Sequence, residues 1–483
     1  MKAKRLLALA LAVMLMLTAF AGCGKKDSDE EGKKPDSGEN QAADAGAQEE
    51  KEFPELDLTK GFSATKVGSF KFDGGLNSSY KVGLTYYKDG KWGIISPDGK
   101  RDTGAKYTEA IEMGKYFRVS TKTTEAVENI QEVNCRGLVD AYGKEIVPMA
   151  YAEVEAITYS ERYYIAYTAK EVTDNKDEAC MFFTDELLKL RPDDDDVMIK
   201  GSWCIYDAVT GKIVPGATGT KGVSPSAKGD VIKFRNDAGE DVHLNSNGTQ
   251  LPKDATVLDN GCYYISTEDS RIVYDPIGTK LFERAKDGYS SLYAADSKEY
   301  LFCESKDGKY VLIDKNGTVV SAEFTKLPSV ADELLIADGK VCNFDGNVIL
   351  NGSYDTIKKD EITNGVWYVS GSDGTAFIKR DGTVLFKCGK NEGISTDKND
   401  MTARNDVTKK FYSFADKDYT IDATALSPWL VQTSGVDNTY DITDTLTGKK
   451  IIEGYKDYSY IVLDGEYFIF ADAGDSVDIY KIS

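Results

Sequence analysis

The sequence is poor in the residues on which most enzymes depend. Its 483 residues include a single histidine, His243, which excludes catalytic or metal sites built on two or three histidines. His243 lies in DVHLNSNG, between a β-like run and a turn, where we expect a strand-edge side chain rather than a general base. The nucleophile motif Gly-x-Ser-x-Gly does not occur. We therefore predict no catalytic residue, no metal site and no cofactor.

The eight cysteines also exclude two common frameworks. Apart from Cys23, they are scattered, odd in number and free of any Cys-x-x-Cys pair, so neither a zinc ribbon nor the disulfide scaffold of a small secreted domain is expected. Three of them, Cys262, Cys303 and Cys342, stand in apolar strand-like runs, where we predict buried free thiols. The others are Cys135, Cys180, Cys204 and Cys388.

Long apolar runs are absent after Cys23, because no later stretch reaches the roughly 18 residues of a membrane span. Before it, three basic residues precede an apolar stretch at residues 6–20, which is short for a span and suits a signal peptide. Ala21-Gly22-Cys23 then resembles the lipobox of bacterial lipoproteins, in which the cysteine carries the lipid. The resemblance implies a signal peptide at 1–22 and lipidation at Cys23. An ordinary cleaved signal and a membrane-anchoring helix are the alternatives.

Residues 23–55 are rich in Glu, Asp, Lys, Gly, Ser and Ala. Such a segment cannot bury enough apolar surface to offset the entropy lost on ordering, so we predict a disordered acidic tether. The folded body is then residues 56–483, and the protein is expected outside the cytoplasm, anchored by lipid to the bacterial cell membrane. Loss of residues 1–22 takes the formal net charge from −21 to −24. Nucleic acid is therefore excluded as a partner.

One pattern recurs along the body. A short run of aromatic and β-branched residues is followed by a polar turn that ends in Gly, and then by a second apolar run. The copies are GKWGIISPDGK (90–100), CRGLVDAYGKEIVP (135–148), SWCIYDAVTGKIVP (202–215), EDVHLNSNGTQLP (240–252), SRIVYDPIGTKLF (270–282), GKYVLIDKNGTVV (308–320), GKVCNFDGNVIL (339–350), GTAFIKRDGTVLF (374–386) and NTYDITDTLTGKKII (438–452).

Each copy is typical of a β-hairpin. Gly, with Asn or Asp beside it, supplies the positive φ that tight turns need, and the flanking residues suit a pleated, half-buried surface. Their near-continuous apolar character predicts burial on both faces of the strands. The copies are about 30 to 45 residues apart, a period typical of repeat folds. The longest interval, around 170–200, contains FTDELLKL, which favours a helical turn or two, and we interpret it as an insertion loop.

The first copy also resembles a known family. GKWGIISPDGK matches the unit of WG-repeat proteins, G-K-[WY]-G-[FLY]-I-[DN]-x-x-G-K, and weaker matches lie at 136–144 and 308–317. The resemblance implies architecture and no catalytic residue, and such repeats are common in bacterial envelope lipoproteins. We predict an all-β fold, a propeller-like ring of about seven or eight four-stranded blades. An open β-hairpin solenoid and two smaller β-repeat modules are the alternatives.

Aromatic residues are the feature with most binding potential. Trp92 and Trp203 occupy matching repeat positions and are expected in the core, whereas Trp367 and Trp429 lie outside that position and are candidates for stacking on a ligand. A second candidate, the oxygen-rich run Asp193, Asp194, Asp195 and Asp196, lacks the spacing of a calcium loop, and solvated carboxylates are expected there.

The expected function is a non-enzymatic binding or scaffolding module for protein or glycan at the cell envelope. A carboxylate-dependent glycan hydrolase or lyase on the same ring is one alternative, because a chain with 80 Asp and Glu offers many carboxylate pairs. A solute-binding lipoprotein is the second alternative.

Overall fold

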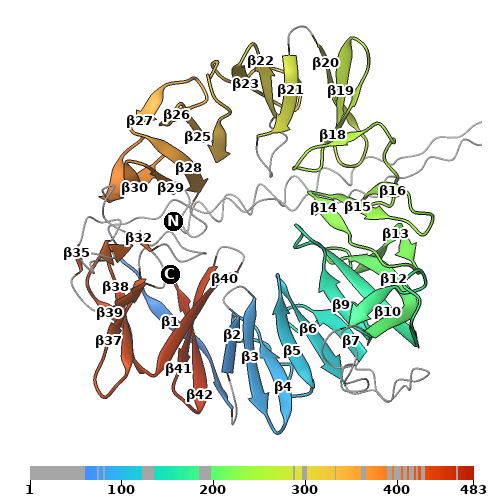
Figure 1. The fold of residues 1–483 in the computed structure, drawn as a ribbon. Coiled ribbons are helices and arrows are strands. Elements are labelled where there is room, and N and C mark those ends of the chain that lie inside the picture. Colours follow the sequence, from blue (N-terminus) through green and yellow to red (C-terminus); the bar gives the residue numbers. More distant parts are fainter. Residues whose placement is uncertain are drawn as a thin grey trace, which may run out of the picture. The chain divides into compact units, whose positions relative to one another are not determined.

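The computed structural model describes residues 60–72, 76–79, 82–121, 135–183, 197–286, 289–295, 302–331, 333–359, 366–388, 394–395, 404–405, 411–412, 418–419, 423–425, 430–463 and 466–483. Every regular element in these ranges is a β-strand, which confirms the all-β prediction. All the described residues belong to one compact unit (Figure 1).

The strands form eleven small sheets within the described ranges, and every strand pair is antiparallel. The first half of the chain contains β2 (Leu76–Ser79), β3 (Gly83–Lys88) and β4 (Lys91–Ile95); β5 (Glu109–Met113), β6 (Tyr116–Thr121), β7 (Cys135–Val139) and β8 (Glu145–Tyr151); β9 (Glu153–Ala156), β10 (Tyr163–Thr173), β11 (Met181–Phe183), β12 (Val197–Asp207) and β13 (Lys212–Gly219); and β14 (Ser226–Lys228), β15 (Val231–Arg235) and β16 (Asp241–Asn245).

The second half contains seven sheets. The first three consist of β17 (Thr256–Val257), β18 (Tyr263–Ser266), β19 (Ser270–Tyr274) and β20 (Lys280–Ala285); of β21 (Tyr289–Ala294), β22 (Phe302–Lys306) and β23 (Lys309–Ile313); and of β24 (Ser329–Ala331), β25 (Leu334–Ala337), β26 (Lys340–Asn343) and β27 (Val348–Leu350). The other four consist of β28 (Tyr354–Lys359), β29 (Val366–Gly371), β30 (Gly374–Lys379) and β31 (Val384–Cys388); of β32 (Ile394–Ser395), β33 (Arg404–Asn405), β34 (Phe411–Tyr412) and β35 (Asp418–Tyr419); of β36 (Ala423–Ala425), β37 (Leu430–Ser434), β38 (Tyr440–Asp444) and β39 (Lys450–Tyr455); and of β40 (Asp457–Leu463), β41 (Glu466–Asp472) and β42 (Ser476–Ile482).

The number of sheets corrects the expectation of about seven or eight. The strands are shorter than expected and many are joined by two-residue turns, so a complete four-stranded sheet fits into residues 329–350. In three sheets isolated bridges take the place of the fourth strand: Trp92 with Tyr107 and Ile95 with Asp102 beside β4, Leu244 with Gln250 beside β16, and Tyr310 with Phe324 and Ile313 with Val319 beside β23. The chain therefore contains more, smaller sheets than the spacing of the repeats implied.

The last sheet is completed by the first strand of the described chain. Strand β1 (Ala64–Lys71) pairs with β42, from Ala64 opposite Ile482 to Lys71 opposite Ser476, so β1 and β42 lie side by side (Figure 1, blue beside red). Just before β1, the N–H of Ser63 donates to the carbonyl of Ser483 at 2.9 Å, and the N–H of Ser483 donates back at 3.0 Å. The two ends of the described chain are thus joined in one sheet.

The repeated motif has a defined local structure. Between β3 and β4, Asp89 and Gly90 have φ angles of 50° and 78°, as a two-residue type I′ hairpin turn requires. The Gly-ending turn of the motif follows β4 and its counterparts. At Asp314, for example, Oδ1 accepts the N–H groups of Asn316 and Thr318, each at 2.9 Å, while Gly317 donates to the Asp314 carbonyl at 3.0 Å.

The same turn recurs at Asp140, Asn236 and Asn245, whose side-chain oxygens also accept the N–H groups two and four residues ahead. The Asp or Asn of the repeat is therefore a hydrogen-bond acceptor that holds the turn, in addition to the Gly that the sequence indicated.

The Trp-Gly pair of the first copy also has a physical reason. Trp92 faces Tyr87 on the paired strand, with ring centroids 5.2 Å apart, and Gly93 faces Tyr86. A Cβ on Gly93 would lie 2.5 Å from the Tyr86 ring, whose hydroxyl is fixed by a 2.8 Å hydrogen bond to Asp102. The glycine therefore makes room for the aromatic ring that covers it.

The inner strands of several sheets are buried on both faces, as their apolar character predicted. On β41, Tyr467, Ile469 and Ala471 pack in the core shared with β38 and β39. The intervening residues, Phe468 and Phe470, pack in the core shared with β3 and β4. Side chains of successive strand residues point to opposite faces, so one strand contributes to two cores. The sheet that contains β1 and β42 consequently packs against the first sheet as well as against the one before it.

The insertion expected at 170–200 is partly an extension of a sheet. Strands β10 and β12 are 11 residues long, and their pairing continues to Thr173 opposite Met198, with β11 added on the far side of β12. Most of FTDELLKL and the four aspartates at 193–196 lie outside the described residues.

Candidate functional site

The most extensive polar network with an exposed aromatic residue beside it centres on Arg162, in the turn between β9 and β10. Ser160 organises this turn, because its Oγ accepts the N–H groups of Arg162 at 3.1 Å and Tyr163 at 3.0 Å, while its own N–H donates to the Ile157 carbonyl at 3.0 Å. The turn is also fixed to the next sheet, since Ala227 donates its N–H to the Thr158 carbonyl at 3.1 Å.

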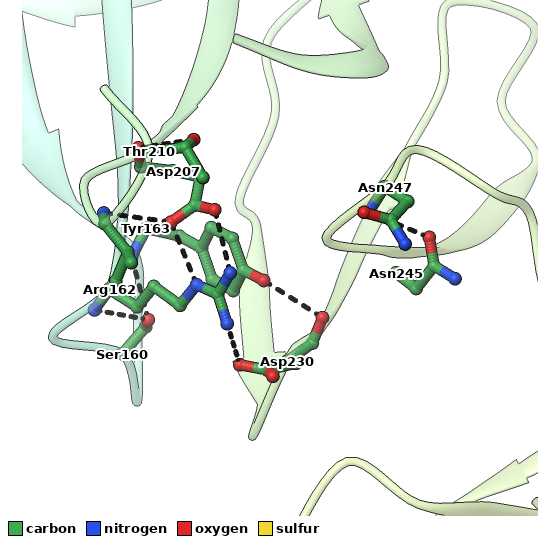
Figure 2. A network of polar contacts seen from close by, with 9 residues as sticks. Ser160, Arg162, Tyr163, Asp207, Thr210, Asp230, Asn245 and Asn247 are labelled. Atoms are coloured by element: carbon green, nitrogen blue, oxygen red, sulfur yellow. Dashed lines mark hydrogen bonds and ion pairs between the residues drawn. The ribbon is translucent and has the colours of Figure 1, made fainter. Parts of the chain in front are cut away.

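The Arg162 guanidinium links the β9–β10 turn to the end of β12 and to the turn between β14 and β15 in the next sheet (Figure 2). Its Nε and Nη2 donate to the two carboxylate oxygens of Asp207, at the end of β12, at 2.9 Å and 2.8 Å. Its Nη1 pairs with Asp230, which lies between β14 and β15. Tyr163 adds a 3.0 Å hydrogen bond from its hydroxyl to the Asp230 carbonyl.

Burial and charge act in opposite directions on this network. Burial disfavours the charged form of Arg162, but its hydrogen bonds to Asp207 and the negative charges of Asp207 and Asp230 outweigh it and raise the pKa of the guanidinium. The Asp207 side chain is 3% exposed, and it also accepts the N–H of Val209 at 3.0 Å in the repeated turn. Arg162 is therefore a fixed cation held by a fork-shaped pair of bonds.

Two apolar side chains flank this network in the open. Tyr159, just before Ser160, is 89% exposed, and its φ of 63° is in the left-handed region that bulky residues rarely adopt. Val209, in the Asp207 turn, is 63% exposed. The turn thus presents an aromatic ring to solvent from a backbone that hydrogen bonds hold on both sides.

A second charged network lies between the neighbouring sheets, and it bears on the enzyme alternative. Arg118 on β6 donates to Glu109 on β5 at 3.0 Å and to Glu153 on β9 at 2.7 Å. Arg136 on β7 lies 3.6 Å and 3.2 Å from the same two carboxylates. Two carboxylates do converge here, but each one is already engaged by arginine, an arrangement that suits packing of the sheets better than proton transfer.

Neither network, as described, contains a cysteine or a group placed to bind a metal ion. Within the described ranges, no group of three His, Cys, Asp or Glu is placed to hold a metal ion. Burial raises the pKa of the Cys262 thiol and of the Cys303 thiol to about 12, so these two cysteines are poor nucleophiles at neutral pH. Cys262, Cys303 and Cys342 are free and buried, which confirms the prediction made for them.

The residues singled out from the sequence are distributed as follows. Trp203 is 2% exposed and Trp92 is half-buried against the neighbouring core, as expected for repeat positions. Trp367 is also only 2% exposed and donates its indole N–H to the Ala331 carbonyl at 3.0 Å. It is therefore a core residue of β29 in this structure, which corrects the expectation that its ring stacks on a ligand.

Other predicted positions are less informative. Cys23, Trp429 and the aspartates at 193–196 lie outside the described residues. His243 lies on β16, half-buried, with its pKa lowered first by burial and then by Lys233.

No part of the Arg162 network was predicted, because Asp207 and Asp230 are 45 and 68 residues away from Arg162 in the sequence. The only local signal was TYSERYY, where a Ser precedes Arg and a tyrosine pair.

Comparison with known proteins adds little. No family model and no curated protein matches the sequence. Among solved structures, the computationally designed Ika8 protein is 12% identical, with a TM-score of 0.23 over 86% of this chain and 99% of that chain. BamB from Moraxella catarrhalis is 12% identical, with a TM-score of 0.22 over 86% and 97%. A eukaryotic initiation factor is 10% identical, with a TM-score of 0.29 over 87% and 96%. TM-scores this low establish neither a shared fold nor a shared function.

The described part of the chain contains no helix long and apolar enough to cross a membrane.

Proposed function

We propose that this chain is a lipid-anchored, extracytoplasmic bacterial protein whose β-propeller-like body, related to WG-repeat lipoproteins, is a non-enzymatic binding or scaffolding module for a protein or glycan of the cell envelope. Cys23 carries the lipid, residues 23–55 form the tether, and residues 56–483 form the body. Each small sheet is one blade.

The observation that carries the architectural part is the pairing of β1 with β42. An open solenoid leaves its first and last units apart and needs caps. Here the first strand completes the last sheet, and Phe468 and Phe470 of that sheet pack with Leu84 and Ile95 of the first. This supports a closed array, in which the sheets protect one another's edges.

The chemistry of the described surface favours binding over catalysis. Arg118 already pairs with the two carboxylates that converge, those of Glu109 and Glu153. The thiols of Cys262, Cys303 and Cys342 are buried. By contrast, Tyr159 lies in the open on a fixed turn. Exposed aromatic residues on rigid supports are typical of interface hot spots.

The anchor is tested by replacing Cys23. In the producing bacterium, the unaltered protein should incorporate a clickable fatty acid and sediment with membranes, whereas Cys23→Ala should lose the label and leave the membrane fraction. Label retained by Cys23→Ala would contradict the anchor. A Cys135→Ala variant is the control for nonspecific loss of a thiol.

The binding function is tested on the same cells. Amine-reactive crosslinking of intact cells should yield a reproducible protein adduct, or the purified full chain should retain glycan on an array. The hydrolase alternative predicts shortened glycan products on incubation with cell-wall material. If products form with no stable adduct, the binding proposal is wrong.

A further inference from the structure

The segment near the start of the described chain is attached to three sheets. The name clasp is used here for residues 61–72, which contain β1. At one end of the clasp, the N–H of Phe62 donates to Oδ2 of Asp444, on β38 of the preceding sheet, at 3.1 Å. Further along, β1 pairs with β42, and a Cβ on Gly68 would lie 3.3 Å from the Cα of Gly99 in the turn after β4. The clasp therefore covers the junction at which the two ends of the described chain meet.

Few side chains hold the clasp in place. Strand β1 is the end strand of its sheet, and in the described chain it pairs with β42 alone. None of its eight residues is fully buried, and a bulge at Val67 interrupts its ladder. By contrast, residues 467–471 of β41, on the other side of β42, are all buried. Elements with few buried contacts and exposed backbone hydrogen bonds are the ones that open locally.

The body keeps its own polar contacts when the clasp leaves. The buried Asp444 carboxylate, which accepts the Phe62 N–H, also accepts the N–H of Leu446 at 2.9 Å. Asp478, which lies 2.7 Å from the Lys66 ammonium, also accepts the hydroxyl of Tyr455. Release of the clasp therefore leaves neither carboxylate without a donor, and the large penalty of an unpartnered buried charge does not arise.

We propose that the clasp releases as one unit from the last sheet while the rest of the body stays folded, so that this junction is the reversible opening point of the array. Release frees the outer edge of β42, which stays paired with β41. It also adds residues 61–72 to the chain that precedes the body, a gain of up to about 40 Å when they are fully extended. With the proposed anchor and tether in place, the body then reaches further from the membrane. The gain in reach rests on that proposal, whereas the release rests on the contacts described here.

The hydrogen-bond pattern of β42 makes the release distinguishable from fraying of the whole sheet. Ser63 and Ser483 exchange both of their backbone hydrogen bonds across the ladder, and N–H groups alternate in direction along an antiparallel strand. Counting back from Ser483, the odd-numbered residues of β42 direct their N–H groups to β1 and the even-numbered residues direct theirs to β41. Release of the clasp exposes the first set and leaves the second set bonded.

Hydrogen exchange of the purified full chain, resolved to single residues by mass spectrometry, tests this pattern. We expect the β1 amides that face β42 and the odd-numbered amides of β42 to exchange together, at least about a hundredfold faster than the amides of β41. The even-numbered amides of β42 should remain protected. Equal exchange of odd- and even-numbered residues, or protection of β1 equal to that of β41, would overturn the proposal.

Low urea separates release from global unfolding. Release exposes little surface, so the exchange of β1 should change little at urea concentrations well below the unfolding midpoint, whereas the exchange of β41 should rise. If both rise equally, β1 opens only when the whole body unfolds and the clasp does not exist as a separate unit.

A reversible lock provides the matched control. The Oγ atoms of Ser63 and Ser483 are 2.9 Å apart, so the double variant Ser63→Cys with Ser483→Cys should form a disulfide in the closed state. Oxidation should slow the exchange of β1 at least about tenfold, and reduction of the same sample should restore it. Exchange that is unchanged by oxidation would show that β1 does not leave from the end nearest the tether, against the proposal.

These results are independent of the anchor test. If β1 exchanges early and the lock slows it, but Cys23→Ala keeps its lipid label, the release stands and the gain in reach is wrong. If β1 is as protected as β41, the release is wrong whatever the anchor test gives.

Discussion

The Arg162 network provides a quantitative test of how the sheets are held together. Arg162→Met keeps the length of the side chain and removes its charge, which leaves the Asp207 carboxylate 3% exposed and without its fork-shaped partner. Removing one member of a buried ion pair typically costs about 3–5 kcal/mol. Arg162 is itself 26% exposed, and Asp207 keeps the Val209 N–H, so we expect a smaller loss, about 2–3 kcal/mol.

A second substitution should recover much of this loss. Asp207→Asn removes the unpaired charge and retains an oxygen that can accept the Val209 N–H. It should therefore stabilise the Arg162→Met variant while destabilising the unaltered chain, giving a coupling of more than about 1 kcal/mol in the double-mutant cycle.

Urea unfolding followed by circular dichroism gives the overall stability, and hydrogen exchange reports residues 226–235 of the neighbouring sheet separately. The separate readout is needed because an array of sheets need not unfold in two states. The matched control is Lys115→Met, which removes an ion pair whose lysine is 72% exposed and should change stability by less than about 0.5 kcal/mol. If Arg162→Met and Lys115→Met behave alike, the network does not hold these sheets together.

Three further predictions concern other parts of the structure. Gly93→Ala should destabilise the first sheet by about 1–3 kcal/mol because its Cβ would meet the Tyr86 ring, and a Tyr86→Leu background should lessen the loss, as measured by urea unfolding. In the native chain, a thiol reagent at neutral pH should modify Cys135, which is partly exposed, before the buried Cys180, Cys204, Cys262, Cys303 and Cys342; simultaneous modification of these six would contradict the burial of the five. Burial opposes the charged form of Asp478, but hydrogen bonds from Lys66 and other neighbours outweigh it and lower its pKa, so its contribution to stability is present above about pH 4 and is lost as the pH falls further. The stability difference between the unaltered chain and Asp478→Asn should shrink in acid, and a constant difference from pH 7 to pH 3 would refute this.

Local features of the fold could be predicted from the sequence because local rules determine them. The Gly-containing turns, the all-β class and the burial of Cys303 and Trp203 follow from turn chemistry and from the apolar character of short segments. The number of sheets could not be read in the same way. The sheet of β32 to β35 carries no copy of the motif, and three sheets have isolated bridges in place of a full fourth strand.

The candidate site was beyond the sequence for a different reason. Arg162, Asp207 and Asp230 meet only because consecutive sheets stack, and nothing in their local sequence distinguishes them from the other charged residues of an acidic chain. Trp367 illustrates the opposite error. Its position outside the repeat suggested exposure, but β29 has a core face of its own and the indole lies within it. A position within the repeat indicates that a side chain is buried, but a position outside the repeat does not indicate that it is exposed.

The pairing of β1 with β42 has a consequence for biosynthesis. Residues 476–482 form the last strand of the described chain, and until they emerge β1 lacks the strand with which it pairs. Earlier sheets can form as the chain emerges, but the final one must wait for the carboxyl-terminal residues. A ribosome that stops before residue 476 would therefore release a chain in which β1 is left as an open, aggregation-prone edge.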